Sequence, residues 1–234
     1  MPEKPPVVLV TGANRGLGLE FSRQYAAEGW QVLAACRTPD EAGELKKLEA
    51  DSGGRVRVLP MDVMDITSVK AAAGVIGKEP IDLLLNNAGV MGPRERLGDL
   101  DYAAWARVLD ANTLGPMRVV ETFVGNVAKG SQKKIVTITS GMGSLADNTS
   151  GGSYAYRSSK AGVNMVVRSL ALDLAPRGIT CIVMNPGWVR TDMGGPRGTI
   201  APAESIKAMR SVIADLRPDD SGKFLNYTGE PFPW

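Results

Sequence analysis

Short apolar runs alternate with longer segments of mixed polarity along most of the chain. The apolar runs are rich in Val, Ile and Leu, and we expect strands at 7–11, 31–36, 55–59, 81–85, 134–138, 179–184 and 223–227. The segments between them predict helices at 17–28, 40–51, 65–78, 101–129, 153–175 and 203–216. Strands that are apolar on both faces and alternate with helices are typical of a parallel sheet covered on both sides. The pattern therefore predicts an α/β fold with a doubly wound parallel sheet.

Length and composition indicate one ordinary globular domain spanning 1–234. Of the 234 residues, 44% are hydrophobic and 22% are charged. The formal net charge is +2, so we expect neither a nucleic acid nor a membrane surface as a partner. No apolar run reaches the roughly 18 residues that cross a bilayer, and the opening MPEKPP lacks the apolar core of a secretion signal. A cytoplasmic location is therefore expected.

The chain contains no histidine, which excludes Ser-His-Asp hydrolysis and histidine-ligated metal sites. Its two cysteines, Cys36 and Cys181, are far apart, and each lies in an apolar run. Two thiols are too few for a cysteine-only zinc site. We therefore expect no metal and interpret both residues as small buried hydrophobic groups.

A glycine loop, TGANRGLG at 11–18, joins the first expected strand to the first expected helix. Its first glycine suits a tight turn, and the later two allow close approach of a pyrophosphate and close packing of helix on strand. Unpaired amides at the start of the helix favour phosphate binding. The dinucleotide contacts expected here are Gly12, Asn14, Arg15, Gly16, Leu17 and Gly18. An ordinary glycine-rich turn is the alternative interpretation.

Arg37 follows the second expected strand in AACRT, where enzymes that prefer NAD usually carry an acidic residue for the ribose 2′-hydroxyl. Arg15 lies within the glycine loop. Two guanidinium groups near the adenosine ribose favour a 2′-phosphate, because arginine offers charged and often bidentate donors. The expected cofactor is therefore NADP(H), unless both arginines are solvated surface residues.

Two further loops follow strand ends on the expected cofactor side. Asp62 and Val63 follow the third strand, and we expect Asp62 to accept a hydrogen bond from the adenine amino group while Val63 packs beside it. A turn or capping role for Asp62 is the alternative. NNAG at 86–89 follows the fourth strand, and its amide side chains can satisfy loop backbone groups while its small residues leave room for a ribose, although it can also be a structural turn alone. The contacts expected from this loop are Asn87, Ala88 and Gly89.

Tyr156 and Lys160 are four residues apart in YRSSK, so they share one face of the helix expected at 153–175. The lysine cation favours the phenolate, and we therefore expect a lowered pKa for the tyrosine. Tyr154 has Ser158 at the same spacing and lacks this pairing. The pair predicts proton exchange with a carbonyl or alcohol oxygen. An aromatic packing residue beside a solvated lysine is the alternative.

Two polar residues complete the expected catalytic set. Ser140 directly follows the fifth strand, and we expect its hydroxyl to hold the substrate oxygen against Tyr156, with Ser144 as the competing serine. Asn112 lies inside the fourth expected helix, where asparagine has a poor propensity. We expect its amide to bridge a water to Lys160, and a polar residue at a kink is the alternative.

Pro186 and Gly187 force a turn after the sixth expected strand, in NPGWVRT. Backbone groups near Val189 and the hydroxyl of Thr191 are expected to hold the nicotinamide carboxamide. These residues complete a site at the carboxyl ends of the strands, where open α/β sheets bind ligands.

In their order along the chain, these motifs resemble the short-chain dehydrogenase/reductase family over essentially the whole sequence. They are TGxxxGxG at 11–18, Asp62, NNAG at 86–89, Asn112, Ser140, YxxxK at 156–160 and the Pro-Gly turn at 186–187. The resemblance implies a Rossmann-type fold and NAD(P) dependence. It also implies Tyr156 as the acid/base, Lys160 on the cofactor ribose, Ser140 on the substrate and Asn112 in a proton relay.

The stretch at 143–160 and the ending FLNYTGEPFPW are similar to the C-factor and sniffer-like carbonyl reductases, a subgroup that favours NADPH. The function implied is reduction of a small-molecule carbonyl with NADPH, and an NADP(H)-binding sensor or signalling protein with little turnover is the alternative. The spacing from Ser140 to Tyr156 is longer than in many members of the family. We expect the extra residues to extend the loop at 144–153.

The helices expected at 101–129 and 153–175 are long and apolar on more than one face, and such helices are usually buried on both sides. The apolar residues are Trp105, Val108, Leu109, Met117, Val120, Phe123 and Val127 in the first helix, and Val163, Val166, Val167, Leu170, Ala171 and Leu174 in the second. Related enzymes pair these two helices across a two-fold axis, which implies a homodimer or a tetramer of dimers. The loop at 144–153 is the counter-argument, because it lies close to the start of the second helix.

Overall fold

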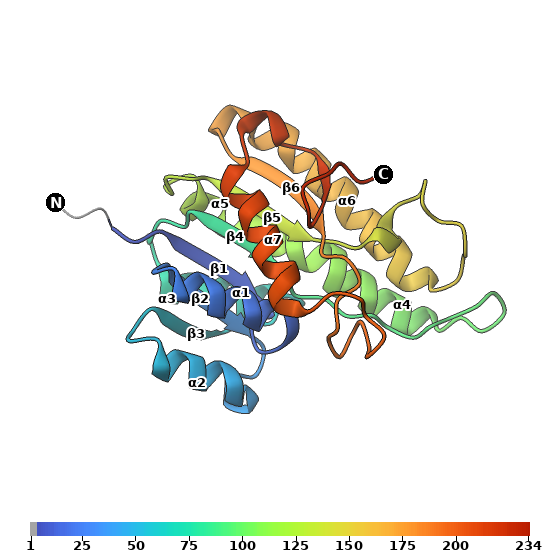
Figure 1. The fold of residues 1–234 in the computed structure, drawn as a ribbon, viewed down its shortest axis with the longest axis horizontal. Coiled ribbons are helices and arrows are strands. Elements are labelled where there is room, and N and C mark those ends of the chain that lie inside the picture. The colour runs from blue at the N-terminus through green and yellow to red at the C-terminus, as the bar shows by residue number, and fades with distance from the viewer. Residues whose placement is uncertain (1–3) are drawn as a thin grey trace.

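The computed structural model describes residues 4–234 and places seven parallel strands in one sheet (Figure 1). The first three residues of the MPEKPP segment lie outside the described residues. In spatial order the strands are β3 (Val56–Pro60), β2 (Gln31–Cys36), β1 (Val7–Thr11), β4 (Leu83–Asn86), β5 (Lys134–Ile138), β6 (Thr180–Asn185) and β7 (Phe224–Asn226). The strand order reverses between β1 and β4, which is where such sheets bind ligands. The predicted doubly wound parallel sheet is confirmed.

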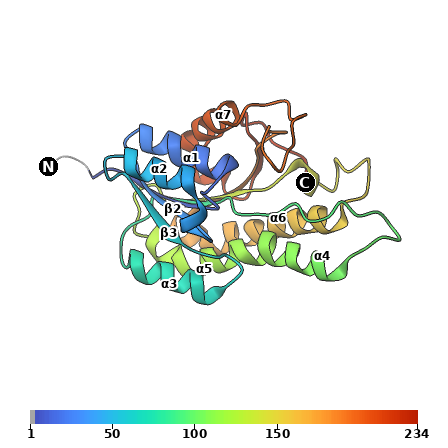
Figure 2. The same ribbon diagram turned by 90° about the horizontal axis from the view of Figure 1, so that it is seen from below.

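Helices cover both faces of the sheet (Figure 2). One face carries α1 (Gly16–Ala27), α2 (Gly43–Asp51) and α7 (Pro202–Asp215), and the other carries α3 (Ile66–Ile76), α4 (Tyr102–Leu109), α5 (Gly115–Val127) and α6 (Tyr154–Leu174). Successive strand residues point to opposite faces, so Val8 and Val10 pack in the core under α1 and α7, while Leu9 packs in the core under α3, α5 and α6. This double burial explains why the strands are nearly continuous apolar runs.

The predicted strand at 81–85 begins later, at Leu83, and ends at Asn86. Asp82 Oδ2 accepts a hydrogen bond from the Val7 amide at 2.8 Å, and Oδ1 accepts from the amide and hydroxyl of Ser131. The predicted helix at 40–51 is divided into a short 3₁₀ turn at Pro39–Glu41 and α2. Ala42 separates them, because its ψ of 61° is not helical.

The long helix predicted at 101–129 is not a uniform α-helix. A π-helical segment at Asp110–Leu114 separates α4 from α5, and the Gly115 amide donates to the Asp110 carbonyl five residues back. Pro116 has no N–H and cannot continue the α-helical ladder, so the chain accommodates one wider turn here. Asn112 lies in this turn. This position matches the alternative interpretation of Asn112, a polar residue at a kink, and the expected water bridge to Lys160 stays a prediction.

Most of the apolar residues that suggested a second apolar face on the two long helices pack within the same subunit. Val120, Phe123 and Val127 of α5 are buried against the sheet, as are Val163, Val167 and Leu170 of α6. Among the apolar residues predicted to cover that second face in the first helix, only Met117 is exposed. The width of the apolar surface reflects packing within the subunit, where α4 lies along α6 (Figure 2).

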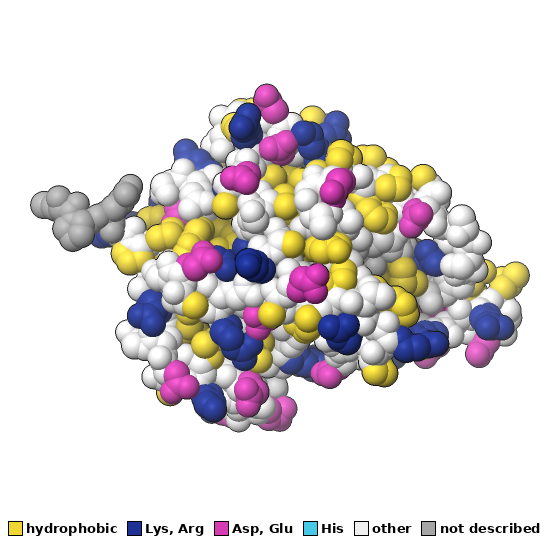
Figure 3. Space-filling view, viewed as in Figure 1, with side chains coloured by type: hydrophobic (Ala, Val, Ile, Leu, Met, Phe, Trp, Pro, Cys, Tyr) yellow, Lys and Arg dark blue, Asp and Glu magenta, His cyan; other side chains and the backbone are white. Residues whose placement is uncertain are grey.

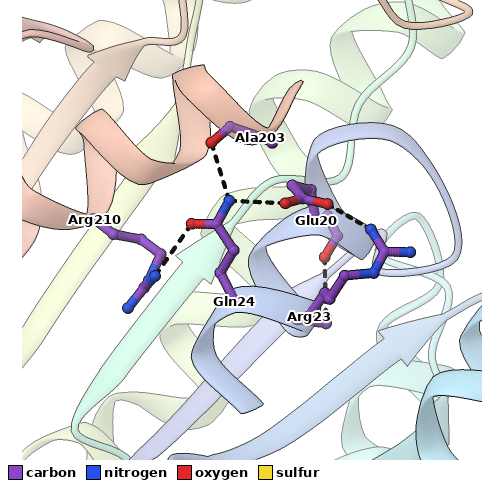
Figure 4. A network of polar contacts seen from close by, with 7 residues as sticks. Glu20, Arg23, Gln24, Ala203 and Arg210 are labelled. Atoms are coloured by element: carbon purple, nitrogen blue, oxygen red, sulfur yellow. Dashed lines mark hydrogen bonds and ion pairs between the residues drawn. The ribbon is translucent and has the colours of Figure 1, made fainter. Parts of the chain in front are cut away.

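A polar network joins α1 to α7 (Figure 4). Gln24 Nε2 donates to the Ala203 carbonyl at 3.0 Å and to Glu20 Oε1 at 2.8 Å, and Arg210 Nη1 donates to Gln24 Oε1 at 3.1 Å. The Arg210 guanidinium also lies over the Tyr25 ring, 4.6 Å from its centroid. Because α1 follows the glycine loop and α7 follows the loop after β6, the network holds the supports of both loops together.

The face shown in Figure 3 carries lysine and arginine side chains interspersed with aspartate and glutamate. Within residues 4–234, none of the helices combines the length and apolar character needed to span a bilayer. The same part of the chain has no cluster of three His, Cys, Asp or Glu side chains suited to a metal ion.

Candidate active site

A cavity of about 280 Å³ lies at the carboxyl ends of the central strands, where the strand order reverses. The predicted residues that line it are Gly12, Asn14, Arg15, Gly16, Leu17, Arg37, Asp62, Val63, Asn87, Ala88, Gly89, Tyr156, Lys160, Pro186 and Thr191. The predicted residues that do not line it are Gly18, Asn112, Ser140, Gly187 and Val189. Segments far apart in the sequence therefore meet around one cavity.

The glycine loop leaves no room for side chains at two positions. Gly12 has φ +64°, and a Cβ there would lie 2.9 Å from the Ala88 Cα. A Cβ on Gly18 would lie 2.2 Å from the Gly12 carbonyl oxygen, so Gly18 lets α1 pack against the loop. No side chain caps the start of α1. Its first amides therefore offer an anion site at the cavity edge.

Thr11, which the sequence analysis did not single out, connects the glycine loop to the NNAG loop. Its hydroxyl accepts hydrogen bonds from the amides of Asn87 at 3.0 Å and Ala88 at 2.9 Å. In the opposite direction, Asn87 Nδ2 donates hydrogen bonds to the carbonyls of Thr11 and Gly12. The amide side chain thus satisfies loop backbone groups, as predicted. The position of Thr11 at the end of a strand, opposite another strand end, was the available signal.

The two arginines predicted at the adenosine ribose differ in their surroundings. Arg37 lines the cavity directly after β2, beside Thr38. Arg15 also lines the cavity, but its Nη1 pairs with Asp192 Oδ2 at 3.1 Å. Both members of this pair are largely exposed, with 70% and 80% of their side-chain surface accessible. Because Arg15 is paired with Asp192 and no ion pair of Arg37 is seen among the described residues, Arg37 is the better candidate to bind a 2′-phosphate.

Asp62 has the turn role that was the alternative, and it also lines the cavity. Its Oδ1 accepts a hydrogen bond from the Met64 amide at 2.9 Å, which makes it a turn residue. Val63 lines the cavity too, and its side chain packs against Gly115. The close approach of Val63 to Gly115 places the start of α5 beside this part of the cavity. The expected contact of Asp62 with adenine stays a prediction.

Tyr156 and Lys160 are both buried at the inner part of the cavity, with 5% and 6% of their surfaces exposed. Lys160 Nζ donates to the Ile138 carbonyl at 2.9 Å and lies 5.8 Å from the centroid of the Tyr156 ring. Tyr154 faces a second, separate hollow with Trp105 and Ser158. The helical spacing thus brings Tyr156 and Lys160 together and excludes Tyr154, as predicted.

The pKa of Tyr156 is raised rather than lowered in the chain itself, which corrects the expectation from the sequence. Burial disfavours the phenolate and raises this pKa, and a hydrogen bond from Ser140 opposes the shift. Burial lowers the pKa of Lys160 to about 8. The lysine lies near the tyrosine, yet desolvation of the phenol is the largest cause of the shift in the tyrosine pKa.

Ser140 is the serine that reaches Tyr156, through the hydrogen bond that affects the tyrosine pKa. Its Oγ also accepts from the Met142 amide at 3.1 Å. Ser144, the competing serine, is buried and donates instead to the main-chain oxygen of Trp234 at 3.0 Å. The geometry therefore favours Ser140 for a substrate contact.

Asn112 uses its amide mainly within the protein. Its Oδ1 accepts from the Val90 amide at 2.8 Å, and its Nδ2 donates to the Val90 carbonyl and to Ser159 Oγ. Both Asn112 Oδ1 and Lys160 Nζ lie within 4 Å of the position that a Cβ on Gly89 would take. Asn112 therefore holds the loop after NNAG, close to Lys160.

The loop after β6 is built around its own hydrogen bonds. Gly187 has φ +78°, and a Cβ there would lie 2.4 Å from Ile200 Cδ1. Val189 is buried and forms a bridge with Ile200, and Thr191 Oγ1 accepts from the Gly194 amide at 3.1 Å. Pro186 and Thr191 reach the cavity, whereas Gly187 and Val189 support the loop.

Several lining residues were not predicted, although most adjoin residues that were. They are Cys36, Thr38, Met61, Met64, Val90, Ala111, Ile138, Thr139, Asp192 and Met193. Cys36 and Cys181 are both buried free thiols, as expected, and burial raises the pKa of each. Cys36 ends β2 and so borders the cavity, a position that its apolar surroundings in the sequence did not reveal.

The family model for short chain dehydrogenases matches residues 6–199. C-signal of Myxococcus xanthus is 46% identical over 166 residues, which cover 71% of this chain and 100% of that protein. The carbonyl reductase Sniffer of D. melanogaster has a TM-score of 0.92 at 29% identity, and the NADPH-bound carbonyl reductase from chicken fatty liver has 0.92 at 34% identity. Each alignment covers 99% of this chain and 100% of that structure. The chain belongs to the short-chain dehydrogenase/reductase family.

Proposed function

We propose that this protein is an NADPH-dependent oxidoreductase that reduces the carbonyl of an aldehyde, ketone or quinone to an alcohol. The observation that carries the proposal is the pair of buried residues Tyr156 and Lys160 in a cavity that the glycine loop also lines, with Ser140 hydrogen-bonded to Tyr156. A phenol, a hydroxyl and a cation gathered at this cavity support hydride transfer coupled to proton transfer.

The cavity walls fit NADP(H) on their own chemistry. Gly12 and Gly18 exclude side chains from the loop, and the uncapped start of α1 supplies amides for the pyrophosphate. Arg37 supplies the charge for a 2′-phosphate, and Asp62 and Val63 border the adenine end. Residues near Pro186 and Thr191 would hold the nicotinamide end. NADPH, when bound there, supplies the hydride.

Tyr156 donates the proton that the carbonyl oxygen needs as it becomes an alcohol. Because burial raises its pKa, the phenol remains protonated at neutral pH and is ready to donate. Ser140 orients the carbonyl oxygen toward the phenol. Lys160, still mostly charged at neutral pH with a pKa of about 8, stabilises the negative charge left on the tyrosine.

The experiment that tests this function follows NADPH oxidation by the purified protein with a panel of aldehydes, ketones and quinones. Tyr156→Phe should keep the fold and NADPH binding and lose about 10²- to 10⁴-fold in carbonyl reduction, because a positioned proton donor is removed. Tyr154→Phe is the matched control, since Tyr154 is on the same helix but faces a different hollow. Turnover of Tyr156→Phe within about threefold of the control would sink the assignment.

A nucleotide-binding sensor or signalling protein with little turnover is the second candidate. The observation that favours it is the similarity to C-signal, whose name describes a signal. A sensor would bind NADPH and oxidise it with no member of the panel, so the same experiment separates the two functions.

A further inference from the structure

We propose that the segment Pro231–Trp234 is a positioning element for the Ser140 loop and thereby controls which carbonyl substrates the site accepts. The inference rests on the proposed function, and it concerns residues far from Ser140 in the sequence. Figure 1 shows this end of the chain beside the start of α6 and the loop that precedes it.

Trp234 anchors the loop through its main chain. Its oxygen accepts hydrogen bonds from the Ala146 amide at 2.8 Å and from Ser144 Oγ at 3.0 Å. Ser144 Oγ in turn accepts from the Asp147 amide at 3.0 Å. Two donors of the loop at 144–153, the Ala146 amide and the Ser144 hydroxyl, therefore depend on Trp234 for their acceptor.

Aromatic packing holds the segment in place. Phe232 and Trp234 both pack on Phe224 of β7, with ring centroids 4.9 Å and 5.4 Å apart. The Phe232 amide donates to the Phe224 carbonyl at 2.8 Å, and Pro231 forms an antiparallel bridge with Leu225. Figure 3 shows apolar side chains gathered over this part of the face.

Phe232 packs against Gly141, the residue that follows Ser140. Its Cζ lies 3.1 Å from the position that a Cβ on Gly141 would take, so only glycine fits there comfortably. The Gly141 amide donates to Asn185 Oδ1 at 3.0 Å, and Asn185 Nδ2 donates to Asn226 Oδ1 at 3.0 Å. Gly141 is thus fixed between the ends of β6 and β7 and the aromatic segment, and Ser140 is the residue directly before it.

The loop held in this way lines the second hollow beside Tyr154, and it meets the catalytic set through Ser140, which hydrogen-bonds Tyr156. The main-chain carbonyl of Glu95, in the loop after NNAG, accepts from the Ser153 amide at 3.0 Å, so the loop at 144–153 is tied to the loop after β4. Releasing Trp234 frees one end of this arrangement and shifts Ser140 relative to Tyr156. Positioning errors of this kind reduce reaction with the substrate far more than binding of the cofactor, whose contacts lie elsewhere.

The test compares the intact chain with a chain that stops after Phe232, with Trp234→Ala, and with Tyr102→Ala as the control. Trp234→Ala removes the ring but keeps the main-chain oxygen, whereas the truncation removes both. Tyr102 is an exposed aromatic residue on α4 whose ring stacks on one neighbour, Trp105. The measurements are kcat and KM across the carbonyl panel, the NADPH dissociation constant, and hydrogen exchange of the amides at 141–148.

The truncated chain should lose about tenfold in kcat/KM for carbonyls and change their order of preference. Its NADPH dissociation constant should stay within about twofold, as for the control. Amide exchange at 144–147 should be about fivefold faster, because an acceptor is lost. Trp234→Ala should show a smaller change in each readout.

Unchanged exchange and kcat/KM in the truncated chain would overturn the proposal, as would weaker NADPH binding in proportion to lost turnover. If the intact protein reduces no carbonyl, the proposed function fails. The exchange measurement still decides whether the segment holds the loop.

Discussion

Tyr156 and Lys160 lie side by side in a part of the protein that water barely reaches, and burial acts on them in opposite senses. It raises the pKa of the phenol and lowers that of the ammonium group to about 8. Both shifts have the same cause, because each charged form loses hydration. The tyrosine therefore stays protonated at neutral pH and can donate its proton. The lysine begins to lose its charge only slightly above neutral pH.

Carbonyl reduction should decline as the pH rises through about 8, because Lys160 then loses the charge that stabilises the developing phenolate. The pH dependence of kcat/KM with NADPH measures this directly, and NADPH binding at each pH serves as the control. A profile that stays flat well above pH 8 would show that the lysine charge is not required.

Arg37 should determine cofactor preference. Arg37→Asp should weaken NADPH binding by about ten- to a hundredfold, since a charge-assisted hydrogen bond is worth roughly 1.5 to 3 kcal/mol, and relatively improve NADH binding. Arg107→Asp, an exposed site on α4, is the matched charge control. Dissociation constants for both cofactors measure the effect. An unchanged ratio would mean that Arg37 is only surface charge.

The sequence predicted the elements well because their signals are local. Buried strands read as apolar runs, and the start of α1 follows directly from Gly12, Gly16 and Gly18. The π-helical segment was missed because it depends on Pro116 and on the reach of Asn112 to Val90, a contact across 22 residues. The Thr11 bridge and the Arg15–Asp192 pair were missed for the same reason. The roles of the site residues themselves stay predictions.

Glycines in two helices offer a matched comparison of packing. Gly18→Ala should destabilise the fold and weaken NADPH binding, because its Cβ would meet the Gly12 carbonyl oxygen at 2.2 Å. Gly125→Ala in α5 should stabilise the protein by about 0.5 to 1 kcal/mol, because its Cβ meets nothing within 4 Å and alanine favours helix. Urea unfolding measures the stability of both variants, and the NADPH dissociation constant measures the effect of Gly18→Ala on binding. A neutral Gly18→Ala would contradict the close packing of α1 on the loop.

Assembly depends on the apolar residues that α5, α6 and the intervening π-helical turn leave on the surface. Leu114, Met117, Met165 and Leu172 are 51%, 37%, 67% and 64% exposed. Exposed apolar residues of this kind favour contact with a second copy. They are fewer than the sequence indicated, because the other apolar residues pack inward.

The protein should therefore form a homodimer, or a tetramer built from dimers, at micromolar concentration. Met165→Glu should shift it toward the monomer, because a charge would be placed in the contact. Val75→Glu, on exposed α3 surface, should leave the mass unchanged. Sedimentation or light scattering measures the mass. A value of 24.8 kDa for the unmodified chain at all concentrations would show that this surface is not an interface.

The most direct test of the central claim is transfer of deuterium from NADPH that carries deuterium at both C4 positions. The protein should convert an aldehyde or ketone of the panel to an alcohol with one deuterium on the former carbonyl carbon, detected by mass spectrometry. Tyr156→Phe should form the same product about 10²- to 10⁴-fold more slowly. NADPH binding without deuterated alcohol from any aldehyde or ketone, and without NADPH oxidation by any quinone, would contradict the account.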